Sequence, residues 1–115
     1  MIYLDTDFLV TSIKYKIDVT AQIKEEFPKE DLAIFDKTFD ELENIGNVNS
    51  KTVLALIKVK GFKVIKTKKD KIVDYLILDR VKKKDMVATQ DKELKNFLKE
   101  KGIKVLTIRQ KKYVR

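Results

Sequence analysis

Short apolar runs alternate along this chain with longer segments in which apolar residues recur every three or four positions. The short runs are typical of buried strands, and the longer segments are typical of amphipathic helices. We expect strands at residues 2–4, 32–35, 62–65, 86–88 and 103–108. We expect helices at about residues 6–17, 18–27, 38–45, 50–60, 72–83 and 89–101. Because the connections are too long for hairpins, the pattern predicts a three-layer α/β/α fold with a parallel sheet of about five strands.

The starts and stops of these helices are predicted from capping side chains. The expected N-terminal caps are Thr6 or Asp7, Thr38, Ser50 and Thr89. Glu41 follows Thr38 by three residues, so the pair is expected to form a capping box. Gly46 is expected to end the same helix.

The composition is that of one globular domain. The chain has 115 residues, of which 43% are apolar and 38% are charged. No apolar run approaches the roughly 20 residues that a membrane span requires. The first residues show neither the basic segment nor the cleavage-site pattern of a secretory signal. We therefore expect a soluble cytoplasmic protein with no membrane partner.

Missing residue types narrow the chemistry further. The chain has no cysteine and no histidine, which excludes disulfides, thiol nucleophiles, the common zinc sites and a Ser-His-Asp triad. Its three glycines are far apart, so no glycine-rich loop can cradle a phosphate. An enzyme with this composition is expected to use carboxylates, lysines and hard metal ions.

Charge divides the chain into an acidic half and a basic half. Residues 1–57 hold six lysines against eleven acids, a net charge of −5. Residues 58–115 hold 20 lysines and arginines against seven acids, a net charge of +13. A basic half favours a polyanionic partner such as nucleic acid. A lysine-rich solubilising surface is the alternative explanation.

Three acids occupy positions that are unusual for solvent-exposed charges. Asp5 ends the first strand and Asp91 follows the fourth, and the carboxyl ends of parallel strands are where active sites form. Asp74 falls inside the apolar arc of its helix, so its charge needs a metal ion, a lysine or an arginine as partner. Helix capping is the simpler explanation for Asp5, and a favourable helix dipole for Asp91. The helical pattern does not choose between Glu41 and Glu43 as a further acid.

Four acidic segments in this order resemble the motifs of the PIN-domain nucleases. They lie at residues 4–9, 39–46, 73–81 and 87–95, and residues 102–113 are similar to the closing strand and tail of one branch. That branch contains the PIN endonuclease of the small-subunit processome and its archaeal relatives, which act in ribosomal RNA processing. VapC-type toxins are a more distant resemblance. The resemblance covers nearly the whole chain and implies a single PIN-like domain at 1–115, with a short basic tail from about residue 109.

The resemblance implies a metal-dependent endoribonuclease that hydrolyses RNA phosphodiester bonds. The acids implied to be catalytic, and to bind one or two Mg²⁺ or Mn²⁺ ions, are Asp5, Glu41, Asp74 and Asp91. The implied accessory residues are Thr6, Asp7, Thr89 and Glu93. The residues expected to bind RNA are Lys68, Lys69, Lys83, Lys111, Lys112 and Tyr113. These side chains provide only oxygen ligands, which hard cations such as Mg²⁺ and Mn²⁺ prefer.

Two residues depart from the family pattern. Asp7 stands where the family usually has asparagine, and Tyr75 stands where it usually has a second acid. Two alternatives to ribosomal RNA processing stay open: a ribonuclease toxin paired with an antitoxin, and a catalytically inactive RNA-binding assembly factor. The corresponding partners are RNA, including precursor ribosomal RNA, together with a second copy of the chain, an antitoxin or a ribosome-assembly protein.

Overall fold

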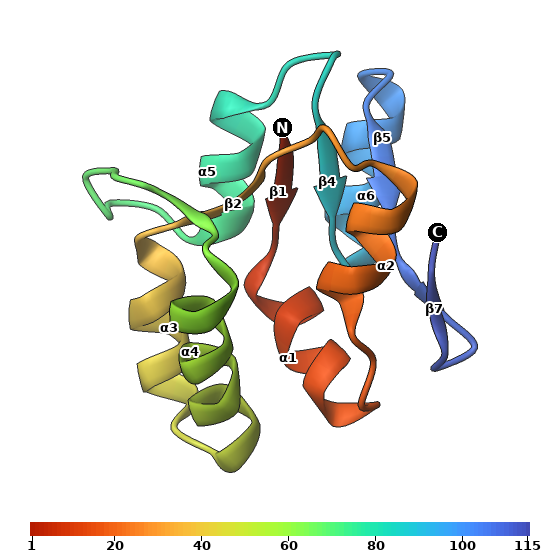
Figure 1. The fold of residues 1–115 in the computed structure, drawn as a ribbon. Helices are drawn as coiled ribbons and strands as arrows, with labels where there is room; N and C mark the ends of the chain where they lie inside the picture. Colours follow the sequence, from red (N-terminus) through yellow and green to blue (C-terminus); the bar gives the residue numbers. More distant parts are fainter.

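A five-stranded parallel sheet forms the centre of the fold. The computed structural model describes all 115 residues, and the strand order is β3-β2-β1-β4-β5. The strands are β1 (Ile2–Leu4), β2 (Leu32–Phe35), β3 (Lys63–Ile65), β4 (Met86–Ala88) and β5 (Lys104–Leu106). Figure 1 shows β1 in the middle of the sheet, with β4 beside it. The predicted parallel sheet is confirmed.

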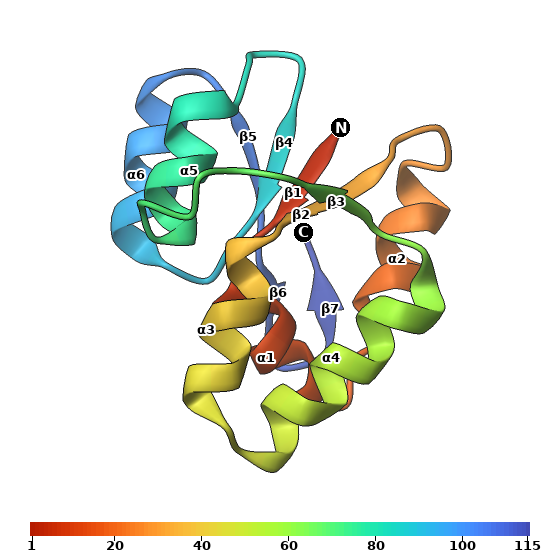
Figure 2. The same ribbon diagram turned by 90° about the vertical axis from the view of Figure 1, so that its left-hand side faces the viewer.

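Helices cover both faces of the sheet. They are α1 (Thr6–Lys14), α2 (Val19–Glu26), α3 (Lys37–Ile45), α4 (Val48–Lys60), α5 (Val73–Arg80) and α6 (Lys92–Glu100). Ile2 and Leu4 of β1 point into a cluster shared with α1 to α4, whereas Tyr3 points into a second cluster shared with α5 and α6. This alternation is the two-residue period of a strand. Figure 2 shows α5 and α6 together on one side of the sheet, which confirms the three-layer fold.

A small antiparallel hairpin follows the sheet. It consists of β6 (Ile108–Arg109) and β7 (Tyr113–Val114). The expected strand at 103–108 is therefore wrong at its end, because the chain leaves the sheet at Thr107. There the Thr107 amide donates to the Arg115 carbonyl at 2.7 Å, and the Arg115 amide returns a bond of 2.8 Å. Gln22 of α2 anchors the hairpin, accepting from the Val114 amide at 2.8 Å.

The helix caps differ from the sequence prediction at four helices. The capping side chains are Asp5 for α1, Asn47 for α4 and Asp91 for α6, in place of Thr6 or Asp7, Ser50 and Thr89. Each actual cap has an extended backbone one step before the helix and accepts an amide bond from it, which is what the cap position requires. The start of α3 has no side-chain cap, so the capping box of Thr38 and Glu41 does not form.

The helix expected at about 72–83 is shorter than predicted. Helix α5 ends at Arg80, because Val81 has an extended backbone and the Asp85 carboxylate takes the Lys82 amide at 2.9 Å. The longest helix, α4, has 13 residues. None of the helices combines the length and apolar character that crossing a membrane demands.

Candidate active site

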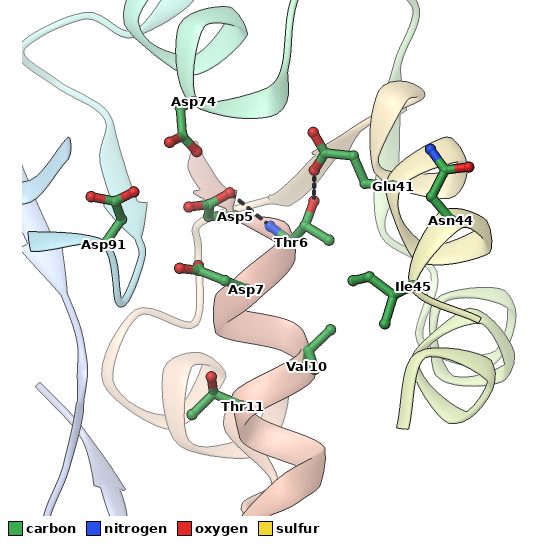
Figure 3. Close-up of a pocket in the computed structure, with 10 residues that line it drawn as sticks. All are labelled: Asp5, Thr6, Asp7, Val10, Thr11, Glu41, Asn44, Ile45, Asp74 and Asp91. Carbon is green, nitrogen blue, oxygen red and sulfur yellow. Dashed lines mark hydrogen bonds between the residues drawn. The ribbon is translucent and has the colours of Figure 1, made fainter. Parts of the chain in front are cut away.

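Five carboxylates from four parts of the chain line one pocket of about 510 Å³. Asp5 follows β1, Asp7 lies in the first turn of α1, and Asp91 follows β4 at the start of α6. Glu41 lies on α3, and Asp74 lies in the first turn of α5. Figure 3 shows Asp74, Asp91 and Asp5 pointing toward one another above Asp7. The pocket is thus at the carboxyl edge of the sheet, where ligands bind in open α/β folds.

Asp5 is the most buried of these acids. Its residue is 3% exposed. One carboxylate oxygen accepts from the Thr6 amide at 2.8 Å, and the other accepts from the Thr89 hydroxyl at 2.8 Å. The Thr89 hydroxyl oxygen in turn accepts from the Asp91 amide at 3.1 Å. Thr89 therefore fixes the start of α6 relative to β1.

Glu41 connects three helices through one carboxylate. Its Oε1 accepts from the Thr6 hydroxyl on α1 at 2.7 Å, and its Oε2 accepts from the Val73 amide on α5 at 3.1 Å. Ile72 at the cap position of α5 offers no polar side chain, so Glu41 supplies a cap from a distant helix. This bond positions the first turn of α5, which carries Asp74.

The electrostatics of the pocket are those of an acidic cluster without a counter-charge. Burial raises the pKa of Asp5 to about 9, and the charges of Asp7 and Asp74 add to the rise. Burial also raises the pKa of Asp74 to about 6, followed by the charges of Asp91, Asp7 and Glu41. The pKa of Asp7 is raised mainly by burial. None of the five acids forms an ion pair with a lysine or arginine.

The donor set of this pocket fits a hard divalent cation by its chemistry. All five ionisable groups are carboxylates, which are the ligands that Mg²⁺ and Mn²⁺ prefer. Burial is the main cause of the raised pKa values of Asp5, Asp7 and Asp74, and the charges of neighbouring acids add to it; a bound cation would favour the charged carboxylates. No three acids form a group tight enough to hold an ion together in this arrangement.

The accessory residues expected from the sequence are mostly at the site. Thr6 and Asp7 line the pocket, and Thr89 bonds to Asp5 behind it. Glu93 instead lines a neighbouring pocket between α5 and α6. Tyr75, in the position of a family acid, is 58% exposed and faces that neighbouring pocket as well.

The six residues expected to bind RNA lie in three separate places. Lys68 and Lys69 are in the loop between β3 and α5, at the same edge of the sheet as the acids. Asp36 holds that loop in place through two hydrogen bonds. Its carboxylate accepts from the Thr67 amide at 2.9 Å and from the Thr67 hydroxyl at 2.7 Å. Lys83 precedes β4 and so lies at the opposite edge. The hairpin holds the remaining three, Lys111, Lys112 and Tyr113.

A lysine face on α6 was missed by the sequence analysis. Lys92, Lys95 and Lys99 recur at helical spacing from the Asp91 cap onward. Burial lowers the pKa of Lys95, and the charges of Lys99, Arg109 and Lys92 lower it further. These four cations are therefore close together, on the helix that begins at Asp91. The three-and-four spacing of the lysines was the signal that could have located them.

A parallel sheet between helix layers, with an acidic pocket at its carboxyl edge, agrees with the PIN-like fold that the sequence motifs predict. Residues 2–111 match a family model described as a PIN like domain, and the chain belongs to this family. Ribonuclease VapC4 of Methanocaldococcus jannaschii is 34% identical over 119 aligned residues, covering 95% of this chain and 90% of that protein. The resemblances to PIN-domain nucleases and to VapC-type toxins stated from the sequence are thereby supported.

Comparison with solved structures also shows a PIN-like fold. The structure of the PIN domain endonuclease Utp24 superposes with a TM-score of 0.85 at 28% identity, covering 99% of this chain and 88% of that one. A domain of a functionally unknown protein from Methanocaldococcus jannaschii superposes with a TM-score of 0.54 at 17% identity, covering 94% and 90%. The second similarity concerns the fold alone. The chain is thus a homologue of proteins named as nucleases.

Proposed function

We propose that this protein is an endoribonuclease that depends on a divalent metal and hydrolyses RNA phosphodiester bonds. The observation that supports the proposal is the pocket with five carboxylates and no counter-charge at the carboxyl edge of the sheet. The similarity to a protein named as a ribonuclease and to one named as an endonuclease points the same way.

In this proposal Asp5, Asp74 and Asp91 hold one or two Mg²⁺ or Mn²⁺ ions, with Glu41 as the fourth acid. Such an ion, when bound, lowers the pKa of its water and neutralises charge on the scissile phosphate. Asp5 is the fixed member of the set, because Thr6 and Thr89 already hold its two oxygens. Glu41 keeps free lone pairs beside its two hydrogen bonds.

Lysines around the pocket supply the attraction for the RNA backbone. Lys68 and Lys69 lie at the edge that carries the acids, and the Lys95 face of α6 adds a second patch. Lys111 and Lys112 would extend contact along the hairpin. Lys83 is at the far edge of the sheet, so an RNA that lies across the pocket reaches it only by wrapping around the molecule.

A cleavage assay with a labelled structured RNA tests the proposal. We expect cuts with Mn²⁺ or Mg²⁺, and no cuts with EDTA or in the Asp5→Asn and Asp74→Asn variants. Asp79→Asn is the matched control, because Asp79 lies on the same helix as Asp74 but is exposed and paired with Lys71 at 2.6 Å. Wild-type cleavage by Asp74→Asn would contradict the assignment of the site. Salt-sensitive binding without cleavage at any metal concentration would identify an inactive RNA-binding factor.

Two biological roles are compatible with this activity, and experiments can distinguish them. The resemblance of the sequence motifs to the small-subunit-processome branch, together with the similarity to the endonuclease Utp24, supports processing of precursor ribosomal RNA. The identity of 34% with ribonuclease VapC4 supports a toxin that a protein antitoxin neutralises. Growth arrest on expression, relieved by a neighbouring reading frame, would favour the toxin. Cleavage at one position of precursor ribosomal RNA, with normal growth, would favour processing.

A further inference from the structure

A small apolar pocket adjoins the acidic pocket between α5 and α6. It has a volume of about 210 Å³ and includes Ile72, Tyr75 and Phe97 among its lining residues. These three side chains are 51%, 58% and 49% exposed, which is unusual for large apolar groups. Asp74 and Asp91 line both pockets. The apolar pocket therefore lies directly beside the candidate active site, with Asp74 and Asp91 shared by the two.

We propose that this pocket binds one unpaired nucleobase of the RNA next to the bond that is cut. The inference rests on the proposed function in one respect, namely that the ligand is RNA. Tyr75 and Phe97 offer aromatic rings for stacking, which is how proteins hold unpaired bases. The proposal makes the substrate single-stranded at this point, because a base inside a duplex cannot enter a pocket.

The charges around the pocket suit a base better than a phosphate. Asp74, Asp91 and Glu93 line the pocket, so its lining repels phosphate. Glu93, which is not among the proposed metal ligands, can accept hydrogen bonds from base amino and imino groups. The loop that leads directly into Ile72 carries lysines at 66, 68, 69 and 71. Phosphates on the loop and a base in the pocket therefore match the distribution of charge.

The size of the pocket separates a base from larger occupants. Pockets for drug-sized ligands measure about 300–1,000 Å³, so 210 Å³ accommodates a single ring system rather than a helix. A stable protein interface needs about 800 Å² on each partner. The exposed parts of Ile72, Tyr75 and Phe97 supply on the order of 300 Å².

Binding of short fluorescent RNAs in EDTA tests the pocket without depending on cleavage. The probes are a single strand of mixed sequence, its duplex, and single strands with one abasic position moved along the chain. We expect Tyr75→Ala and Phe97→Ala each to weaken single-strand binding about tenfold, with little change for the duplex. Tyr75→Phe should bind as the wild type does. Val59→Ala, which removes an exposed apolar side chain on α4, is the control.

The abasic series identifies the base that enters the pocket. The wild type should lose affinity at one abasic position, and Tyr75→Ala should show no further loss at that position. Unchanged binding in both alanine variants, or equal losses on single strand and duplex, would overturn the proposal. A dimer that separates on Tyr75→Ala and Phe97→Ala would show that the patch is an interface between copies. Cleavage lost only in Asp5→Asn, with stacking variants unaffected, would refute the base pocket and leave the nuclease standing.

Discussion

The carboxylate of Asp5 is expected to destabilise the metal-free protein. Asp5 is 3% exposed and has no cationic partner, and burial raises its pKa to about 9. In the unfolded chain an aspartate has a pKa of about 3.9. At pH 7 the residue must therefore take up a proton on folding. Asp5→Asn removes this requirement and keeps an oxygen that can accept from the Thr6 amide.

The magnitude follows from the separation between the unfolded pKa and the working pH. Each pKa unit corresponds to about 1.4 kcal/mol, so roughly three units cost about 4 kcal/mol at pH 7. Replacing the bond from Thr89 with an amide contact offsets part of this gain. We expect Asp5→Asn to raise the free energy of unfolding by about 1–3 kcal/mol at pH 7.

The sign of the pH dependence is fixed by the direction of the shift. Between the unfolded pKa and about 9, the folded state holds the proton and the unfolded state does not. Stability of the wild type therefore falls as pH rises through this window, and the penalty disappears near pH 4. The advantage of Asp5→Asn should be close to zero at pH 4 and larger at pH 8 than at pH 6.

Urea unfolding followed by circular dichroism in EDTA measures this difference at several pH values. Adding Mn²⁺ should stabilise the wild type and leave Asp5→Asn nearly unchanged, because only the native acidic site binds the ion. Asp79→Asn controls for the general loss of one negative charge. A variant less stable than the wild type at every pH would refute the reasoning, since it would show that the bond from the Thr89 hydroxyl outweighs the cost of the buried carboxylate.

Three further predictions concern residues around the site. Glu41→Ala should lower the free energy of unfolding by about 1 kcal/mol, because α5 loses its cap. It should also speed hydrogen exchange of the Val73 amide, whereas the control Glu43→Ala should change neither quantity. Gln22→Ala should release the hairpin, seen as faster exchange at Val114 with little change in global stability, because only local bonds are lost. Lys95→Ala should reduce the slope of log affinity for RNA against log salt by about 0.7–0.9, as for one lost phosphate contact, and an unchanged slope would remove that lysine from the interface.

The alternation of strands and helices was readable from the sequence because it depends on local apolar periodicity. The convergence of Asp5 and Asp91 was also predictable, since parallel strands bring their carboxyl ends to one edge. Asp74 was located by its place in the apolar arc of its helix. These three inferences required only apolar periodicity and a parallel arrangement of the strands, and no detailed side-chain geometry.

Other features depend on contacts between distant residues and could not be read locally. The periodicity of α3 did not distinguish Glu41 from Glu43, but the Val73 amide and the Thr6 hydroxyl do. Thr89 resembled a helix cap, yet its hydroxyl bonds to Asp5 across 84 residues. The hairpin was missed because its bond between Thr107 and Arg115 has no signal in apolar spacing.

The central place of β1 has a consequence for synthesis of the chain. Strand β1 is flanked by β2 and β4, and β4 pairs with it in the register Ile2 with Met86. Asp5 thus leaves the ribosome 84 residues before its partner Thr89. The acidic pocket therefore forms only after the polypeptide has emerged as far as Asp91.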